Sequence, residues 1–444
     1  MTRAAPRRLS PFEHAIWRLS EAATFNFAII SRVRGPLTED TLNASLRLVQ
    51  ARHPLLQLRV ETADEEPWFQ TNDVPPPVLH CTRQSDGDWT SQAAEQINQP
   101  ISSETGPLVR CQLIRHADDQ HDIILTIHHL IGDGMSGVYL MRDLLRAANQ
   151  LAAGDSPETL EPLADMTPID QRMPENSRGM SGAWRHWNLV GRTLFDDLRW
   201  GAAARLQPHG EPSLESRRVL LVPKQFDEGF STALRDRARA AGATVHSALS
   251  AAILLATADH IDPAKRVSVK HRTPMNVREQ LAPPAGEDVG MFASMLFYRG
   301  RCAGGDDFWA LARAVREQLV RKMKADQALV NIRIAAWLYR AIGGDRLTHQ
   351  QLIEQWRKRA RTTTALTNLG QLKLEWPEDP LRVETIRFVA SPGPLGDSTC
   401  TALSFQGQLY CNFIFVAPTF QRESAERLSM SIVERLEAAT NQNS

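Results

Sequence analysis

Hydrophobic residues recur along the first part of the chain with two different periods. Residues 37–51 place apolar side chains three and four positions apart behind Thr38, a favourable N-cap residue, and predict a helix. From Leu56 to Val60 apolar and polar residues alternate, which predicts a half-buried strand. The chain therefore begins as a mixture of helices and strands.

The alternation is strongest in two neighbouring segments. Residues 108–115 and 122–128 are rich in apolar and β-branched side chains, and a polar turn separates them, so we predict a β-hairpin. Every other residue from Ile123 to His129 shares one face of its second strand, so an apolar face ends in a histidine. A Gly-Asp-Gly turn follows, and helical spacing of apolar residues from Ser136 onward predicts a packed helix.

The periodicity weakens between residues 154 and 216 and then returns. The intermediate stretch contains several prolines together with Trp184, Trp187 and Trp200, and we expect a long ordered crossover because tryptophans usually need burial. The remaining part predicts strands and helices in alternation: strands at 218–222, 266–271, 295–298 and within 401–416, and helices at 228–241, from 244 onward and at 306–323.

The length of 444 residues exceeds what one hydrophobic core usually organises. Together with the element order, it predicts an α/β (α+β) fold in two halves. We expect an N-terminal subdomain over residues 1–153, a crossover over 154–216 and a C-terminal subdomain over 217–444.

Composition and charge exclude several classes of protein. Hydrophobic residues make up 42% of the chain and charged residues 23%, which is typical of a globular protein and not of a disordered one. Lys plus Arg and Asp plus Glu both total 51, so no strong net charge attracts nucleic acid. Five cysteines without CxxC spacing indicate free thiols in a reducing compartment.

Targeting and membrane signals are not found. The basic N-terminus is not followed by an apolar region, and the longest uncharged apolar run, residues 248–258, is shorter than the roughly 20 residues of a membrane span. We expect a soluble, cytoplasmic protein without a membrane span, and a monomer.

Residues 127–137, which read IHHLIGDGMSG, carry the strongest chemical signal. The strand end places an imidazole at the mouth of a cleft, and the glycines around Asp133 let the backbone reverse so that its carboxylate comes back toward the imidazole. Because histidine has an unperturbed pKa near 6.5, it is largely neutral at pH 7 and can accept a proton from a hydroxyl or amine. This pattern favours a general base.

Three other interpretations compete with this one. A histidine beside apolar residues is usually a hydrogen-bonded core residue, and an Asp between glycines is usually a turn or an N-cap. His128 and His129 point to opposite strand faces and have no HExxH or Cys-rich partner, so we expect no metal. Ser136 does not lie in a GxSxG elbow, which disfavours a hydrolase nucleophile.

The segment His-His-Leu-Ile-Gly-Asp-Gly, residues 128–134, resembles the HHxxxDG signature of the condensation-domain and chloramphenicol-acetyltransferase-like acyltransferase superfamily. Further segments resemble this family in the same order: residues 10–19, the Arg-His motif at 52–59, the buried helix at 242–256, the pair 272–278 and 288–292, and Thr-Asn-Leu-Gly at 367–370. The resemblance covers nearly the whole chain.

The resemblance implies two chloramphenicol-acetyltransferase-like subdomains arranged as a V-shaped pseudo-dimer, with the histidine motif in a central tunnel. It implies that His129 is the catalytic base and that Asp133 points away from it to pair with an arginine, for which we expect Arg278 and keep Arg272 as the alternative. His128 would be structural, and Gly134 would allow close approach of the backbone to the thioester.

The same resemblance implies acyl transfer from a thioester on phosphopantetheine or CoA to a small-molecule alcohol or amine. No cofactor would be bound by the protein itself, and an acyl or peptidyl carrier protein would be the partner, in natural-product or lipid biosynthesis. A non-catalytic module that docks or recruits carrier proteins on the same fold is the alternative, but such members usually lose the second His or the Asp. Both are present here.

The chain also departs from the family's patterns. Ala293 and Ser294 stand where peptide-condensing members usually carry Val-Asn, and the plant-type Asp-Phe-Gly-Trp-Gly segment is not found. The sequence is therefore most similar to stand-alone bacterial acyltransferases that act with polyketide or peptide assembly lines. It assigns no oxyanion donor.

Overall fold

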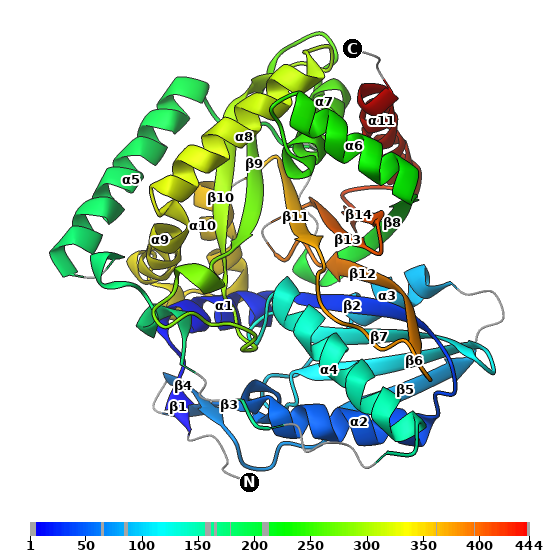
Figure 1. Cartoon of the computed structure of the whole chain (residues 1–444). Coiled ribbons are helices and arrows are strands. Elements are labelled where there is room, and N and C mark those ends of the chain that lie inside the picture. The colour runs from blue at the N-terminus through cyan, green and yellow to red at the C-terminus, as the bar shows by residue number, and fades with distance from the viewer. Residues whose placement is uncertain are drawn as a thin grey trace. The chain divides into compact units, whose positions relative to one another are not determined.

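The computed structural model of the protein describes residues 6–63, 66–83, 88–155, 161–163, 167–177, 179–206, 213–360, 362–394 and 396–441 (Figure 1). These residues form two compact units. Unit 1 comprises residues 1–172, 278–292 and 372–391, and unit 2 comprises residues 173–277, 293–371 and 392–444. Both units mix helices with mixed β-sheets, which confirms the predicted α/β class.

The two units are discontinuous in sequence, whereas the sequence predicts contiguous subdomains over 1–153 and 217–444. Unit 1 takes two segments from the later part of the chain because each is bonded into it. The segment 372–391 adds a strand to its sheet, and the segment 278–292 hydrogen-bonds to the turn at Asp133. The local hydrophobic pattern does not indicate that either segment belongs to unit 1.

The main sheet of unit 1 has five strands in the order β12-β2-β7-β6-β5. Only the β5–β6 pair is parallel; the other neighbours are antiparallel. The strands are β2 (Asn26–Arg34), β5 (Val78–Arg83), β6 (Val109–Ala117), β7 (Gln120–His128) and β12 (Arg382–Ala390). Strand β7 lies between β2 and β6 and is buried along nearly its whole length, so the element that carries the histidine motif is firmly held.

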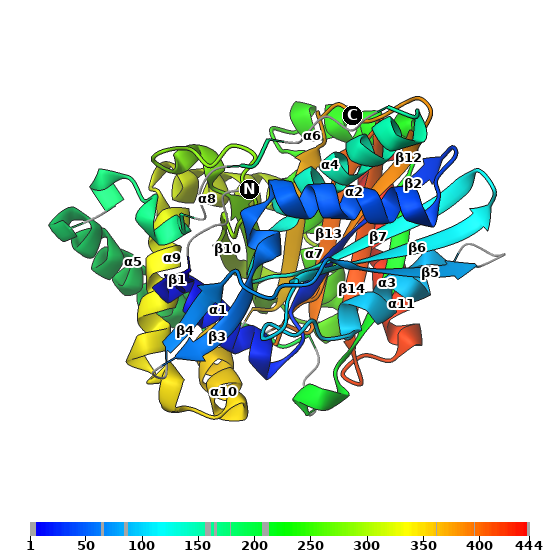
Figure 2. The same cartoon turned by 90° about the horizontal axis from the view of Figure 1, so that it is seen from below.

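Helices and a small sheet complete the described part of unit 1 (Figure 2). Helix α4 packs against α2 and against strand β2, and the capping of α2 by Thr38 is as predicted. The helices are α1 (Pro11–Ala22), α2 (Glu39–Arg52), α3 (Trp89–Asn98) and α4 (Gly134–Ala152). The small sheet, in the order β1-β4-β3, contains β1 (Arg7–Arg8), β3 (Arg59–Ala63) and β4 (Glu66–Gln70).

The sheet of unit 2 has six strands in the order β10-β9-β11-β13-β14-β8. Strand β11 pairs in parallel with both of its neighbours, and the other pairs are antiparallel. The strands are β8 (Arg218–Phe226), β9 (Val267–Asn276), β10 (Ala293–Cys302), β11 (Thr364–Gln371), β13 (Ser398–Phe405) and β14 (Gln408–Ala417).

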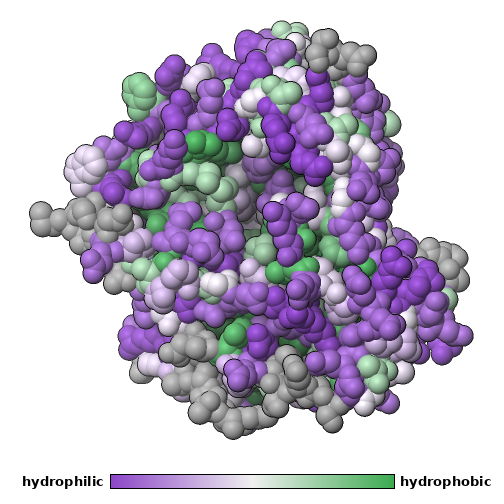
Figure 3. Space-filling model, viewed as in Figure 1, coloured by the Kyte–Doolittle hydropathy of each residue, from purple (hydrophilic) through white to green (hydrophobic). Residues whose placement is uncertain are grey.

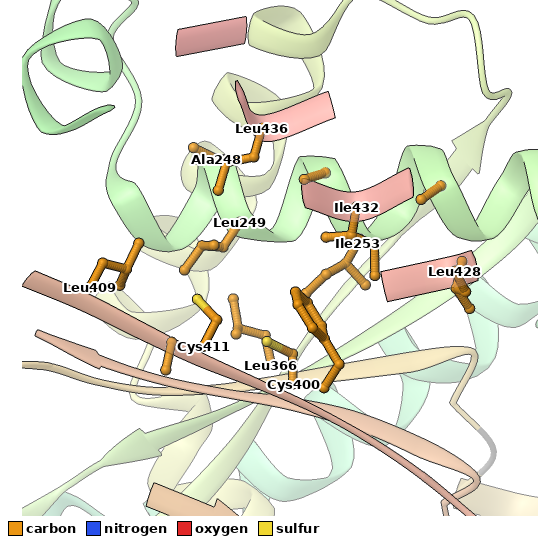
Figure 4. Packing of buried hydrophobic residues seen from close by; sticks show 14 of the residues in the cluster. Ala248, Leu249, Ile253, Leu366, Cys400, Leu409, Cys411, Leu428, Ile432 and Leu436 are labelled. Atoms are coloured by element: carbon orange, nitrogen blue, oxygen red, sulfur yellow. The ribbon is translucent and has the colours of Figure 1, made fainter. Parts of the chain in front are cut away.

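One face of this sheet forms a hydrophobic core with the helices that cover it (Figure 4). The apolar helix α7 (Val245–Ile261), capped by Thr244, contributes Ala248, Leu249 and Ile253. They meet side chains from β11, β13, β14 and α11 (Arg422–Asn441): Leu366, Cys400, Leu409, Cys411, Leu428, Ile432 and Leu436. The other helices of unit 2 are α5 (Gly179–Trp200), α6 (Glu228–Ala240), α8 (Phe308–Lys324), α9 (Gln327–Ala341) and α10 (His349–Ala360).

Most predicted elements are present with small shifts in their ends, but two expectations are wrong. The predicted strand from Leu56 begins only at β3, because residues Pro54–Gln57 form a 3₁₀-helix. In the crossover, residues Gly179–Trp200 form a helix, and its Trp184 and Trp187 are exposed rather than buried. A tryptophan in an amphipathic stretch predicts burial only if another element covers that face.

All five cysteines are free thiols, and four of them are buried. Within the described part of the chain, no single helix has the length and apolar character required to cross a membrane, although the bent pair α6 and α7 passes such a test together by length and composition alone. The molecular face in Figure 3 is mostly hydrophilic, with hydrophobic side chains in small groups.

Candidate active site

His129 lies immediately after the last residue of β7. Its backbone N–H donates to the carbonyl oxygen of Phe25 at 3.0 Å, which extends the pairing of β7 with the residues before β2. The imidazole ring is half-buried between two aromatic rings, with centroid distances of 4.4 Å to Phe25 and 5.0 Å to Phe27. These contacts hold the ring at the end of a central strand.

A hydrogen bond at one ring nitrogen determines the tautomer of His129. Its Nδ1 lies 2.9 Å from the carbonyl oxygen of Gly132. A carbonyl oxygen can only accept, so Nδ1 must carry the proton and donate it. In the neutral imidazole the lone pair is then on Nε2, which is the ring atom that can accept a proton.

His128 has a different environment. It is buried, and its Nδ1 accepts a hydrogen bond from the backbone N–H of Leu130 at 3.1 Å. Burial lowers the pKa of His128 to about 3, with a further contribution from neighbouring His129, so the ring stays neutral at physiological pH. These contacts fit the structural role that the resemblance implies for this residue.

Asp133 is the N-cap of α4. Its carboxylate accepts from the backbone N–H of Ser136 at 2.9 Å, from the Ser136 hydroxyl at 3.0 Å and from the backbone N–H of Phe292 at 3.0 Å. Neither Gly132 nor Gly134 has a positive φ, so the turn does not use the left-handed conformation that glycine allows. Gly134 is buried as the first residue of α4.

The Asp133 carboxylate is turned toward Arg278. The Arg278 Nη1 atom lies 2.8 Å from Oδ2 and 3.1 Å from Oδ1 of Asp133, and both side chains are almost completely buried. Burial alone would raise the pKa of the Asp133 carboxyl, but the charge and hydrogen bonds of Arg278, with those of Ser136, outweigh it and keep the pKa below its usual range. The group is therefore an anion at neutral pH.

Two aromatic rings cover the Arg278 guanidinium. Its central carbon lies 4.9 Å from the centroid of Phe292 and 5.7 Å from that of Tyr139. Arg272, the alternative partner, lies on β9 in unit 2, where burial lowers its pKa to about 10. The structure thus brings together Asp133 and Arg278.

Ser136 is also a member of this cluster, although its sequence context suggests only a disfavoured nucleophile. Its hydroxyl oxygen accepts from Arg278 Nη2 at 2.8 Å and from the backbone N–H of Gly290 at 3.1 Å. The hydroxyl proton has two acceptors in reach, Asp133 Oδ1 at 3.0 Å and the Gly290 carbonyl at 2.8 Å. The signal that could have identified it is its spacing, because a residue three positions after an N-cap Asp lies beside the capping carboxylate.

A second buried ion cluster lies on α4 in unit 1. The Asp143 carboxylate accepts from Arg52 Nε at 2.8 Å, from His53 Nε2 at 3.0 Å and from Arg142, and Arg142 also binds Glu287 in a bidentate pair at 2.7 Å. Burial raises the pKa of Asp143, but His53 and Arg142 outweigh it and lower the value to about 2. In the Arg-His motif at residues 52–59, Arg52 and His53 therefore have a structural role, which is to bind the Asp143 carboxylate.

The two clusters are joined by the segment 278–292. It contributes Arg278 and the Phe292 backbone to Asp133, and Glu287 to Arg142. Asp288 of the same segment binds Arg172 at 2.8 Å. Among the residues that the structure describes, no group of three or more His, Cys, Asp or Glu side chains is placed to hold a metal ion.

Known proteins similar to this chain include peptide synthetases and acyltransferases. The family model described as "Condensation domain" matches residues 16–329. Phosphinothricin tripeptide synthetase PhsC from Streptomyces viridochromogenes is 27% identical over 337 residues, which cover 72% of this chain and 30% of the synthetase. The chain therefore spans about a third of the length of that relative.

Solved structures share the fold at low sequence identity. Trichothecene 15-O-acetyltransferase from Fusarium sporotrichioides superposes with a TM-score of 0.76 at 14% identity, over 98% of this chain and 95% of the other. The first condensation domain of the calcium-dependent antibiotic synthetase gives a TM-score of 0.73 at 16% identity, over 99% and 97% of the two chains. Both similarities concern the fold.

Proposed function

The chain belongs to the condensation-domain family, and we propose from this premise that it is an acyltransferase in which His129 is the general base. The donor would be an acyl thioester on a carrier protein's phosphopantetheine arm or on CoA. The acceptor would be a small-molecule alcohol or amine, and the product an ester or an amide. We place this reaction in the cytoplasm.

The tautomer of His129 is the observation that carries the proposal. The Gly132 carbonyl holds the proton on Nδ1, and the lone pair on Nε2 can take a proton from the acceptor's hydroxyl or amine while that atom attacks the thioester carbonyl carbon. When the carbon–sulfur bond of the tetrahedral intermediate breaks, Nε2–H returns the proton to the departing thiolate. The proton taken from the acceptor thus ends on the thiol that leaves, and the reaction needs neither a covalent acyl-enzyme nor a bound cofactor.

In this mechanism Asp133 and Arg278 are positioning residues. Their charges neutralise each other away from solvent, and Ser136 and the Phe292 backbone use the remaining hydrogen-bonding capacity of the carboxylate. These contacts fix Asp133, the residue that follows Gly132, and so restrict the movement of the turn that carries the Gly132 carbonyl. A change in this turn would misplace the carbonyl and, through it, the proton on Nδ1.

The sequence relatives support a carrier-bound donor. The sequence relative named above is a tripeptide synthetase, and the match covers 30% of its length. Carrier proteins deliver acyl groups as thioesters, for which a neutral base and a positioned acceptor are the required catalytic groups. Removal of a general base of this kind typically costs about 10²- to 10⁴-fold in rate.

The proposal is tested by incubating the protein with a panel of acyl-carrier and acyl-CoA thioesters and candidate acceptors, and detecting ester or amide products by mass spectrometry. His129→Ala should lower product formation by at least about a hundredfold. His80→Ala is the matched control, because it removes an exposed imidazole from β5. Equal activity of the His129→Ala variant would refute catalysis by His129, and carrier binding with no transfer by the unaltered protein would favour a docking module.

A further inference from the structure

Helix α5 carries a row of apolar side chains on one exposed face. Trp184, Trp187, Phe195 and Leu198 are 69%, 59%, 62% and 85% exposed. At 3.6 residues per turn they fall within an arc of about 80° and extend over about 21 Å of the helix. Gly191 lies in the same row, and nothing lies within 4 Å of the position that a Cβ would take there. We call these five residues the α5 stripe.

This stripe is unusual for a protein surface. Single exposed apolar residues need no explanation, but a continuous row with three large aromatic rings marks an interaction site. Trp337 of α9, also exposed, lies edge-to-face against Trp187 at a centroid distance of 5.7 Å and widens the apolar surface. In both views α5 lies at the edge of unit 2, outside α8 and α9 (Figures 1 and 2).

A row of arginines runs parallel to the stripe. Arg185, Arg192 and Arg199 are spaced by seven residues, so they lie on one side of α5, beside the apolar arc. Arg192 and Arg199 are exposed, and the Arg199 guanidinium lies 4.9 Å from the ring centroid of Trp200. The helix therefore combines exposed aromatic rings with a basic flank.

Neighbouring acidic groups are balanced by cations. Arg185 binds Asp326 at 2.8 Å, and Asp196 interacts electrostatically with Lys322. These carboxylates lie toward the body of unit 2, since Asp326 precedes α9 and Lys322 is on α8. Among the side chains of α5 that the structure describes, the charge beside the stripe at the surface is thus positive, and it complements an anionic partner.

We propose that α5 docks the protein on the surface of an anionic lipid bilayer. A membrane accepts a single convex ridge of side chains without a complementary groove, whereas a protein partner must match its shape over roughly 800 Å² per side. Tryptophan prefers the interfacial region, where its ring is in contact with acyl chains and its N–H with headgroups. Arg192 and Arg199 would meet lipid phosphates while Trp184, Trp187, Phe195 and Leu198 enter between headgroups.

The test uses the full-length protein and vesicles of phosphatidylcholine alone or with a quarter of phosphatidylglycerol. Co-sedimentation should show binding to the mixed vesicles that weakens in high salt. The pair W184Q and W187Q should weaken binding by at least about tenfold, and R192Q with R199Q by several-fold. Tryptophan fluorescence of the unaltered protein should shift to shorter wavelength on binding.

Two controls separate the stripe from general surface effects. M430Q with V78Q removes two exposed apolar side chains elsewhere, and R422Q with R427Q removes two exposed arginines of α11. Both control pairs should bind vesicles like the unaltered protein. Circular dichroism spectra should be the same for all variants.

Several results would overturn the proposal. The unaltered protein would fail to bind mixed vesicles, or the W184Q and W187Q double variant would bind them as well as the unaltered protein does. A third such result is self-association in size-exclusion chromatography that the double variant abolishes, with no detectable binding to vesicles. Acyl transfer measured without vesicles should be unaffected by these substitutions. The membrane proposal and the catalytic proposal can therefore fail separately.

Discussion

Asp133 and Arg278 form a buried ion pair although 145 positions separate them in the sequence. Two hydrogen bonds connect them, and their side chains are 4% and 1% exposed. Burying each of these charges costs free energy, and their mutual attraction offsets that cost. If either side chain loses its charge, the other remains as a buried, unpaired charge.

The first prediction concerns this pair. Asp133→Asn or Arg278→Ala should each lower the free energy of unfolding by about 3–5 kcal/mol, and the double variant should be far less destabilised than the sum. Urea unfolding of the four proteins measures the coupling. Full additivity would mean that the two groups do not stabilise each other.

The second prediction concerns the other ion cluster of α4. Asp143→Asn removes the charge that faces Arg52 and Arg142, and it should cost about 3–5 kcal/mol of unfolding free energy. Arg146→Gln, three residues later on the same helix, removes an exposed contact to Glu375 and should change stability by less than about 0.5 kcal/mol. Equal effects would contradict the assignment of Asp143 as a buried anchor.

The third prediction concerns acid pH. Burial lowers the pKa of His128 and of His271 to about 3 and that of His246 to about 4, so these rings stay neutral when folded but take up protons near pH 6.5 when unfolded. A lowered folded pKa means that the stabilisation is complete above about pH 6.5 and is lost as the pH falls toward the folded values.

As the pH falls from about 6 to about 4, each of these histidines should reduce the free energy of unfolding by about 1.4 kcal/mol per pH unit. His271→Asn replaces a ring whose Nδ1 lies 2.8 Å from the Thr364 hydroxyl. Urea unfolding at pH 7, 6 and 5 should show a shallower pH slope for this variant than for the unaltered protein. An unchanged slope would indicate that His271 becomes protonated in the folded protein.

The fourth prediction concerns the packing of α4 on the sheet of unit 1. A Cβ at Gly137 would lie 2.8 Å from atoms of both Ile29 and Phe27, and Phe27 in turn packs on His129. Gly137→Ala should therefore lower the unfolding free energy by about 1–3 kcal/mol despite its better helix propensity.

Gly191→Ala is the matched control for this substitution. It is also a helical glycine, but nothing lies within 4 Å of its Cβ position, so it should stabilise the protein by about 0.5–1 kcal/mol. Thermal unfolding compares the two variants. A Gly137→Ala protein as stable as Gly191→Ala would mean that the neighbours of Gly137 move aside without cost.

Much of the fold was predictable because its signals are local. Thr38 and Thr244 cap helices that begin within two residues of their expected positions, and the hairpin of β6 and β7 follows from alternation and one polar turn. The crossover tryptophans Trp184 and Trp187 are expected to be buried but lie exposed on α5, because the presence of a tryptophan does not reveal whether another element covers it.

The sequence by itself determined many of the strands and helices, the caps Thr38 and Thr244, and the position of His129 at a strand end, since period and capping depend on neighbours a few residues apart. Only the tertiary structure decided that β12 and the segment 278–292 join unit 1, that Gly132 holds the proton on His129 Nδ1, and that Ser136 bridges Asp133, Arg278 and Gly290. These contacts arise because buried charges and polar groups must find partners, and such partners can lie anywhere along the chain.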